Sequence, residues 1–345
     1  MKIQNHTIGI GQPSFIIAEV AQAHDGSLGQ AHAYIEAAAQ AGVDAVKFQT
    51  HIAEAESTLD EPFRVRFSLQ DATRYDYWSR MEFTFEQWQG LAEHAREKKL
   101  VFLSSPFSVQ AVEMLEKLSV SAWKIGSGET FSDDILRTVL KTGKPVLVST
   151  GMSTFQEIDN LTRRLNTKKI PFALFQCTSK YPVDFSEVGL NIIQEMKERY
   201  CCPVGLSDHS GSIFSVLAAI AQGADIIEAH IVFDKKMFGP DTPASLTVED
   251  FKMLTRAREA FHQMNANPVD KDKMSESMRQ MRSMFGKSLA TVKDLPAGSI
   301  LTNEMLTAKK PGTGIPFGQK SKLIGNILKN DVSSNRLIRW EDISE

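Results

Sequence analysis

Short apolar runs recur along the first 235 residues, and each of them ends in polar side chains. The polar ends of eight such runs are Glu19, Lys47 to Gln49, Ser104 and Ser105, Lys124 to Ser127, Ser149 and Thr150, Cys177 to Ser179, Ser207 to His209, and His230. Segments with helical period separate consecutive runs, a pattern typical of parallel strands joined by crossover helices. The sequence therefore predicts an α/β fold, a (β/α)8 TIM barrel whose strand ends converge on one active face.

Two of the crossover helices have clear start signals. Thr84 and Gln87 are three residues apart and predict a capping box, and Thr247 and Asp250 predict a similar start. Apolar residues at helical spacing follow both signals. We expect these apolar stripes to be core faces that pack against the barrel wall.

A long segment between Thr50 and Glu82 interrupts the alternation of strand and helix. It is rich in charged and aromatic residues, including Arg64, Arg74 and the aromatic stretch 75–78. Long loops inside compact domains are usually functional. We therefore expect this segment to form a flap over the barrel mouth.

The pattern changes again after residue 265. We assign residues 1–265 to the barrel and residues 266–283 to a linker. Residues 284–345 contain short strands and turns around glycines and prolines, which predicts a separate small β-rich domain. A domain of about sixty residues is expected to have little core of its own.

Composition narrows the class of protein. The chain has 345 residues, 42% of them hydrophobic, and a formal net charge of -3. No basic stretch is interleaved with aromatics, so nucleic acid is not an expected partner. Neither a leader nor an apolar run of membrane-spanning length is evident, so we expect a cytoplasmic protein without a membrane partner. Cys177, Cys201 and Cys202 are expected to be reduced thiols.

Two histidines indicate a metal site. His209 and His230 end the seventh and eighth predicted strands, so they should lie side by side at the mouth. Two imidazoles with oxygen donors suit Mn²⁺, with Mg²⁺ or Co²⁺ as alternatives. The other interpretation is a pair of structural histidines at strand ends. His51 and His94 are expected to be surface or loop residues.

A carboxylate, two lysines and several serines accompany the histidines. Glu19 ends the first strand, where a buried charge needs a cation or hydrogen-bond donors, and a simple ion pair with Lys47 is the alternative. Fixed positive charge with hydroxyl donors suits a phosphoryl group, so we expect an anion site at Lys47, Lys124, Ser127, Ser149 and Ser207. Each serine could equally cap a strand end, and the lysines could be Schiff-base nucleophiles, as in barrel aldolases.

Eight short motifs follow one another along the predicted barrel: FIIAEV (15–20), HDGSL (24–28), VKFQT (46–50), KIGSGE (124–129), STGM (149–152), QCTSKYP (176–182), GLSDH (205–209) and GPDTPASL (239–246). They carry a resemblance to the sialic acid synthases that extends over essentially the whole chain, and the C-terminal residues resemble the antifreeze-like (SAF) domain of that family. The resemblance implies a transferase that condenses phosphoenolpyruvate with N-acetylmannosamine or a related N-acylated aldose. The products would be a nine-carbon 2-keto-3-deoxy acid, of the sialic or nonulosonic type, and phosphate.

The resemblance also implies roles for individual residues. It assigns the metal to His209 and His230, and it places Glu19 close to the bond-forming centre. The positions that match family contacts to phosphoenolpyruvate are Lys124, Ser127, Ser149, Ser179 and Ser207, and Ser105 matches a position that is often threonine. The positions that match contacts to the acceptor sugar are Gln49, Tyr181 and Asp241.

The chain departs from the family pattern at two positions. Lys310 stands where family members often carry an arginine that reaches the acceptor's N-acyl group across a dimer interface, and Ala229 replaces a long basic residue. These changes leave precursors of legionaminic and pseudaminic acid open as acceptors. The resemblance further implies a homodimer in which each SAF domain covers the partner's barrel. Other interpretations are a synthase acting on a phosphorylated aldose, a Schiff-base aldolase, or a non-catalytic carbohydrate-binding barrel.

Overall fold

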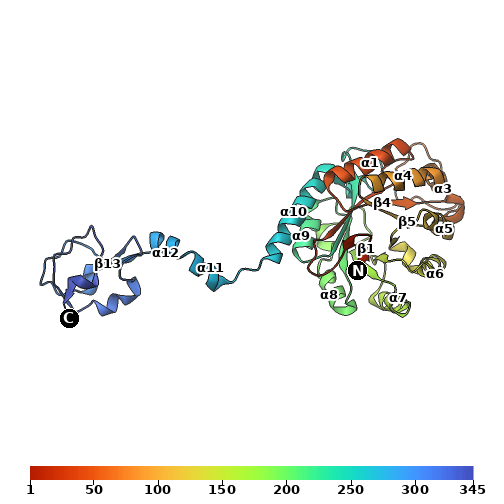
Figure 1. Cartoon of the computed structure of the whole chain (residues 1–345). Helices are drawn as coiled ribbons and strands as arrows, with labels where there is room; N and C mark the ends of the chain where they lie inside the picture. Colours follow the sequence, from red (N-terminus) through yellow and green to blue (C-terminus); the bar gives the residue numbers. More distant parts are fainter. Residues whose placement is uncertain (345) are drawn as a thin grey trace. The chain divides into compact units, whose positions relative to one another are not determined.

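The computed structural model describes residues 1–344 and divides the chain into two compact units (Figure 1). The first unit is Met1–Ala266, and the second begins at Asn267. Residue 345, where the expected C-terminal domain ends, lies outside the described residues.

Eight parallel strands form a nearly closed barrel in the first unit. They are β3 (Phe15–Ala21), β4 (Ala45–Thr50), β5 (Val101–Pro106), β6 (Trp123–Ile125), β7 (Val146–Ser149), β8 (Phe172–Cys177), β9 (Val204–Asp208) and β10 (Ile226–Val232). The hydrogen-bonded order is β5-β4-β3-β10-β9-β8-β7-β6, and β5 contacts β6 to complete the ring. Each strand coincides with one of the apolar runs, so the predicted TIM barrel is confirmed.

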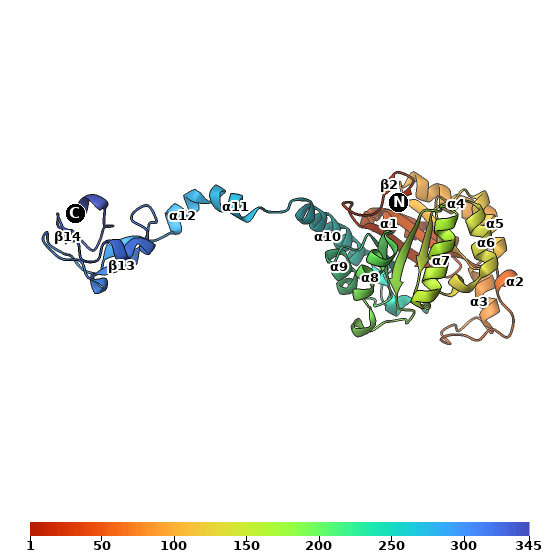
Figure 2. The ribbon, with the colours of Figure 1, turned by 90° about the horizontal axis from the view of Figure 1, so that it is seen from below.

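Helices surround these strands in two perpendicular views (Figures 1 and 2). They are α1 (Leu28–Ala41), α2 (Ala53–Glu56), α3 (Arg74–Met81), α4 (Phe85–Glu97), α5 (Val109–Lys117), α6 (Asp133–Lys141), α7 (Phe155–Thr167), α8 (Asn191–Tyr200), α9 (Ile213–Ala221) and α10 (Val248–Ala266). The predicted capping box of Thr84 and Gln87 is present. Thr247 and Asp250 bond reciprocally at the start of α10, as predicted. The apolar faces that follow both caps are buried in the main core.

A short hairpin covers the amino ends of the barrel strands. It consists of β1 (Lys2–Ile3) and β2 (His6–Thr7), which pair antiparallel. Ile3 and Ile8 join a buried cluster with Phe15, Ile17 and Ile226 near the starts of β3 and β10. This cluster fills the amino end of the barrel with apolar side chains, and the cavity described below opens at the other end.

The second unit has a small core of its own. The expected linker, residues 266–283, contains the short helix α11 (Lys271–Ser277) and the start of α12 (Arg279–Phe285), which ends two residues beyond it. Four short strands follow: β12 (Ser288–Thr291), β13 (Leu306–Lys309), β14 (Ile327–Leu328) and β15 (Ile343–Ser344), paired as two antiparallel ladders. The apolar side chains buried between them are Leu289, Leu295, Leu301, Leu306, Ile315, Leu323, Leu328, Val332, Ile338 and Ile343. This core is larger than we expected for a domain of this length.

Among residues 1–344, no helix combines the length and the hydropathy needed to cross a membrane.

Candidate active site

A cavity of about 430 Å³ opens at the carboxyl ends of the barrel strands. It is lined by all the site residues predicted in the first unit: Glu19, Lys47, Gln49, Ser105, Lys124, Ser127, Ser149, Ser179, Tyr181, Ser207, His209, His230 and Asp241. Lys310 belongs to the second unit, where its ammonium lies 5.1 Å from the ring centre of Phe285.

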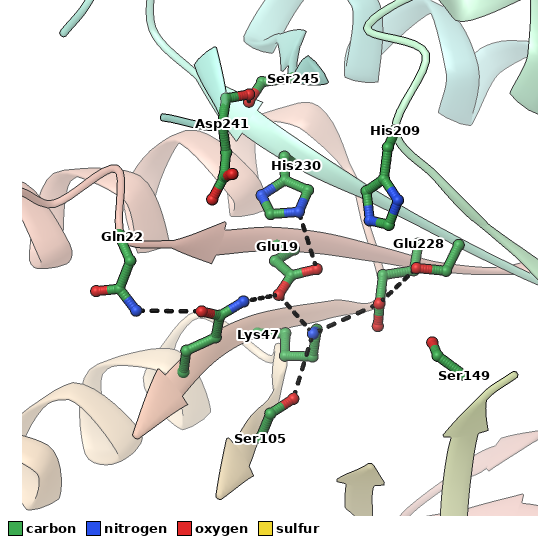
Figure 3. Close-up of polar contacts among 12 residues, drawn as sticks. Glu19, Gln22, Lys47, Ser105, Ser149, His209, Glu228, His230, Asp241 and Ser245 are labelled. Atoms are coloured by element: carbon green, nitrogen blue, oxygen red, sulfur yellow. Dashed lines mark hydrogen bonds and ion pairs between the residues drawn. The ribbon is translucent and has the colours of Figure 1, made fainter. Parts of the chain in front are cut away.

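Glu19 is held by donors from the neighbouring strand (Figure 3). Its Oε1 accepts hydrogen bonds from Lys47 Nζ at 2.6 Å and from Gln49 Nε2 at 2.9 Å. Burial alone would raise the pKa of Glu19, but the charges of Lys47, His230 and Lys124 outweigh burial and keep the pKa well below its ordinary value. Glu19 is therefore an ionised carboxylate at neutral pH. The ion pair with Lys47 is present, while Oε2 faces His230 Nε2 at 3.5 Å.

Glu228 lies between the two lysines and was not among the predicted site residues. Its Oε1 is 3.4 Å from Lys47 Nζ and 3.2 Å from Lys124 Nζ, and it accepts a hydrogen bond from Ser207 at 3.0 Å. Glu228 stands two residues before His230 on β10, so the period of two along a strand puts both side chains on the barrel's inner face. That alternation is the signal by which the sequence could have revealed it.

Burial and pairing act differently on the two lysines. Burial would lower the pKa of Lys47, but Glu19 and Glu228 overcome this effect and raise it. Burial lowers the pKa of Lys124, and Glu228 compensates only in part. Lys124 also donates to Ser149 Oγ at 2.7 Å. Lys124 and Ser149 thus form a paired donor group on the side of the cavity next to β6 and β7.

The remaining serines surround the lysines. Ser105 Oγ accepts from Lys47 at 3.4 Å, and Ser127 Oγ accepts from the backbone N–H of Gly151 at 3.1 Å. The space at Gly151 is narrow, because a Cβ there would lie 2.7 Å from Ser179 Oγ and 3.0 Å from Ser127 Oγ. Ser127 and Ser179 therefore pack closely against the backbone at Gly151.

His209 and His230 lie side by side, as the strand order requires. Their ring centres are 5.4 Å apart. At the amino ends of the two strands a glycine allows β9 to approach β10, because a Cβ at Gly205 would lie 2.2 Å from the carbonyl oxygen of Ile226. His209 Nδ1 is 3.1 Å from the carbonyl oxygen of Thr178. Since a carbonyl only accepts, Nδ1 carries the proton and Nε2 keeps its lone pair.

The donor set fits a divalent cation with few protein ligands. Among residues 1–344, no cluster of three or more His, Cys, Asp or Glu side chains is arranged as a ready-made metal cage. Two imidazoles with the Glu19 carboxylate nearby would leave positions for substrate and water. The two lysines balance Glu19 and Glu228 in charge, so this cluster of four side chains has no surplus positive charge, although Arg64 and Arg74 also line the cavity.

Arg64 connects the segment between β4 and α4 to the opposite rim. Its Nη2 donates to Asp241 Oδ1 at 2.8 Å, and its guanidinium carbon lies 4.2 Å from the ring centre of Tyr181. Tyr181 in turn stacks on His209 at 4.0 Å. The predicted flap therefore contributes side chains to the cavity, among them Glu61, Phe67 and Trp78.

His51 was expected to be a surface or loop residue; it lies in the loop that follows β4, but it is buried and does not reach the surface. The residue is 4% exposed because it lies between the rings of Trp78 and Phe107. His94 is partly buried on α4, where it bonds to Glu36. The three cysteines are free thiols, and Cys177 lines the cavity 3.8 Å from His209 Nδ1.

Comparison with known proteins gives a consistent result. Residues 34–270 match the model of the NeuB family, and residues 286–344 match the SAF domain. The N,N'-diacetyllegionaminic acid synthase of Campylobacter jejuni is 32% identical over 94% of this chain and 99% of its own length. The human N-acetylneuraminate-9-phosphate synthase is also 32% identical, over 94% of this chain and 90% of its own. A crystal structure of the sialic acid synthetase from Leptospira borgpetersenii superposes with a TM-score of 0.72 and 29% identity, covering 81% of this chain and 96% of that protein.

Proposed function

The chain belongs to the NeuB family of nonulosonic acid synthases, and on this basis we propose that it condenses phosphoenolpyruvate with an N-acylated aldose. The products would be a nine-carbon 2-keto-3-deoxy acid and inorganic phosphate. N-acetylmannosamine is the simplest acceptor. Precursors of legionaminic or pseudaminic acid are the alternatives.

One observation carries the proposal. Two buried lysines share Glu228 next to Ser149 and Ser207, and two histidines from adjacent strands stand beside them in the same cavity. Lys124, Ser127, Ser149, Ser179 and Ser207 would bind the phosphate and carboxylate of phosphoenolpyruvate, since charge-assisted hydrogen bonds suit such groups. The acceptor would occupy the side next to Gln49, Tyr181 and Asp241.

The geometry supports a role for Glu19 in orienting water. C3 of phosphoenolpyruvate would attack the aldehyde carbon of the open-chain sugar, whose oxygen takes up a proton and becomes a hydroxyl. Water would add at the cationic C2 and lose a proton. The tetrahedral species then expels phosphate. Because Glu19 is ionised and held by Lys47 and Gln49, its carboxylate can accept a hydrogen bond from that water. Lys47 would keep Glu19 in place while the charge at C2 changes.

A divalent cation, most simply Mn²⁺, would be held by His209 and His230. When bound, it would supply Lewis-acid polarisation of the acceptor's aldehyde. It would also add the positive charge that the neutral cluster of lysines and glutamates lacks. We further propose that the active form is a homodimer in which the SAF domain of one chain, with Lys310, completes the acceptor site of the other.

The bond that breaks distinguishes this function from phosphatase or kinase chemistry. Phosphoenolpyruvate labelled with ¹⁸O at the bridging position would be incubated with Mn²⁺ and a panel of N-acylated aldoses. We expect a 2-keto-3-deoxy acid from at least one aldose, with the label in the released phosphate. Unlabelled phosphate would mean that water attacked phosphorus, and no product with any aldose would favour the non-catalytic barrel.

A further inference from the structure

His51 forms close contacts on both ring faces and through both ring nitrogens. Its ring lies nearly parallel to Trp78 at 3.9 Å and to Phe107 at 4.4 Å, with interplanar angles of 13° in both cases. Nδ1 is 2.5 Å from Glu56 Oε1, and Nε2 is 3.3 Å from Gln49 Oε1. No ring nitrogen is left to act on a substrate.

The direction of these hydrogen bonds follows from the carboxylate at the end of the chain of contacts. Gln49 Nε2 donates to Glu19 Oε1 at 2.9 Å, and the same oxygen accepts from Lys47 Nζ at 2.6 Å, so the amide nitrogen of Gln49 faces Glu19. The amide oxygen of Gln49 then faces His51 and Gln22 Nε2, the latter at 3.1 Å. His51 Nε2 therefore faces an acceptor, the amide oxygen of Gln49, and Nδ1 faces the Glu56 carboxylate.

We propose that His51 and Glu56 are positioning residues for the condensation, acting through Gln49 on Glu19. Together with Gln22, His51 fixes which way the Gln49 amide points, so that its N–H group always faces Glu19 (Figure 3 shows Gln22 and Glu19). This inference rests on the proposed function, since Glu19 is its point of action. It adds a network that begins outside the residues assigned to substrate and metal.

The network also connects the long segment to the chemistry. Glu56 ends α2 and Trp78 lies on α3, both between β4 and α4, whereas Gln49 and Glu19 lie on barrel strands. Trp78 is anchored within the segment, because its Nε1 donates to Glu61 Oε2 at 3.0 Å. When the segment is in place, it holds His51 and thereby orients Glu19. Displacement of the segment would release the Gln49 amide.

The test separates the hydrogen bonds from the aromatic packing. His51→Phe keeps a ring between Trp78 and Phe107 but removes both polar contacts. We expect kcat to fall about tenfold while the KM for phosphoenolpyruvate changes less than about twofold, as for other supporting residues behind a reactive group. His94→Phe is the matched control on α4, outside the cavity, and should leave kcat unchanged. Thermal unfolding of each variant reports on folding.

A double-mutant cycle then asks whether His51 acts through Gln49. In a Gln49→Ala background, His51→Phe should change kcat less than about twofold, because the partner is already missing. The proposal would be overturned if His51→Phe lowered kcat by the same factor with and without Gln49→Ala. It would also be overturned if His51→Phe alone left kcat unchanged. Glu56→Gln, which lies outside the aromatic stack, repeats the cycle if His51→Phe does not fold.

A readout independent of turnover completes the test. The ring ¹⁵N signals of His51, assigned by their loss in His51→Phe, should show a proton on Nε2, because the partner of Nε2 is the amide oxygen of Gln49. A bare Nε2 would contradict the hydrogen bond to Gln49, whatever the activity. The wild-type protein could release no phosphate with any aldose and still show the expected proton on His51 Nε2. In that case the proposed function would be wrong, but the hydrogen-bond network around His51 would be supported.

Discussion

The charges of four buried side chains in the cavity balance one another. Lys47 and Lys124 offset Glu19 and Glu228, and all four side chains are at most 4% exposed. A buried network of this kind adds little net stability, because desolvation opposes the Coulomb attraction. Its value is to hold ionised groups at fixed positions before the substrate arrives.

Turnover is expected to depend on a divalent cation. Chelation should abolish turnover and Mn²⁺ should restore it, because the neutral cluster alone has no surplus charge for an anionic substrate. The double variant His209→Ala, His230→Ala should stay inactive at any Mn²⁺ concentration, and His94→Ala should behave like the wild-type protein. Full turnover in a chelated sample would exclude the metal role.

His24 gives a prediction about pH and stability. Burial, with the nearby charges of His51 and Arg80, lowers the pKa of His24 to about 3, from an ordinary value of 6.5. Below pH 6.5 the unfolded chain binds a proton at His24, whereas the folded protein does not bind it until about pH 3. The free energy of unfolding therefore decreases as the pH falls through this range. Between pH 7 and 5 the loss should be about 2 kcal/mol.

The variant that checks this is His24→Asn, which keeps an acceptor for the Gly26 N–H that His24 Nδ1 now binds. Urea unfolding of both proteins would be measured at pH 7 and pH 5. The loss of unfolding free energy between these two pH values should be about 2 kcal/mol smaller in His24→Asn than in the wild-type protein. The same pH dependence in both proteins would mean that His24 titrates normally.

At the level of elements, the sequence was sufficient for what depends on local pattern. The eight apolar runs became strands and the Thr84 and Thr247 caps formed, because strand period and capping act within a few residues. The burial of His51 was not foreseen. It depends on Trp78 and Phe107, which are distant in the chain and meet His51 only in the folded barrel.

The segment between β4 and α4 is expected to depend on one arginine for its position. Arg64 ties it to the opposite rim through Asp241 and Tyr181. An exposed ion pair and a cation–π contact together contribute about 1 kcal/mol. Arg64→Ala should therefore make residues 57–73 several-fold more sensitive to limited proteolysis and raise the KM of the acceptor. Arg66→Ala, at an exposed position in the same segment, is the control. Equal cleavage of both variants would show that Arg64 does not hold the segment.

At the level of the whole molecule, the proposal to test is that the second unit helps to bind the acceptor. Lys310 is the residue through which we expect the SAF domain to meet the acceptor's N-acyl end. Lys310→Ala should raise the acceptor's KM with little change for phosphoenolpyruvate, the kinetic sign of lost ground-state binding. Lys320 is a matched control, because its ammonium also lies over a phenylalanine ring of the same unit, at 5.5 Å from Phe317. If substitution of Lys320 by alanine raised the acceptor's KM as much as Lys310→Ala does, Lys310 would have no specific role in binding the acceptor.

The exchange of SAF domains between chains can be tested by complementation. A chain truncated after Arg282 keeps the barrel, which has its own core, but lacks the SAF domain. The full-length double variant His209→Ala, His230→Ala keeps the SAF domain but lacks the proposed metal ligands. Each should be inactive alone. If the SAF domain of one chain completes the barrel of its partner, refolding the two together should form mixed dimers in which the intact barrel meets an intact SAF domain, and turnover should reappear. If each SAF domain instead serves its own barrel, every chain in the mixture is defective and no activity can return.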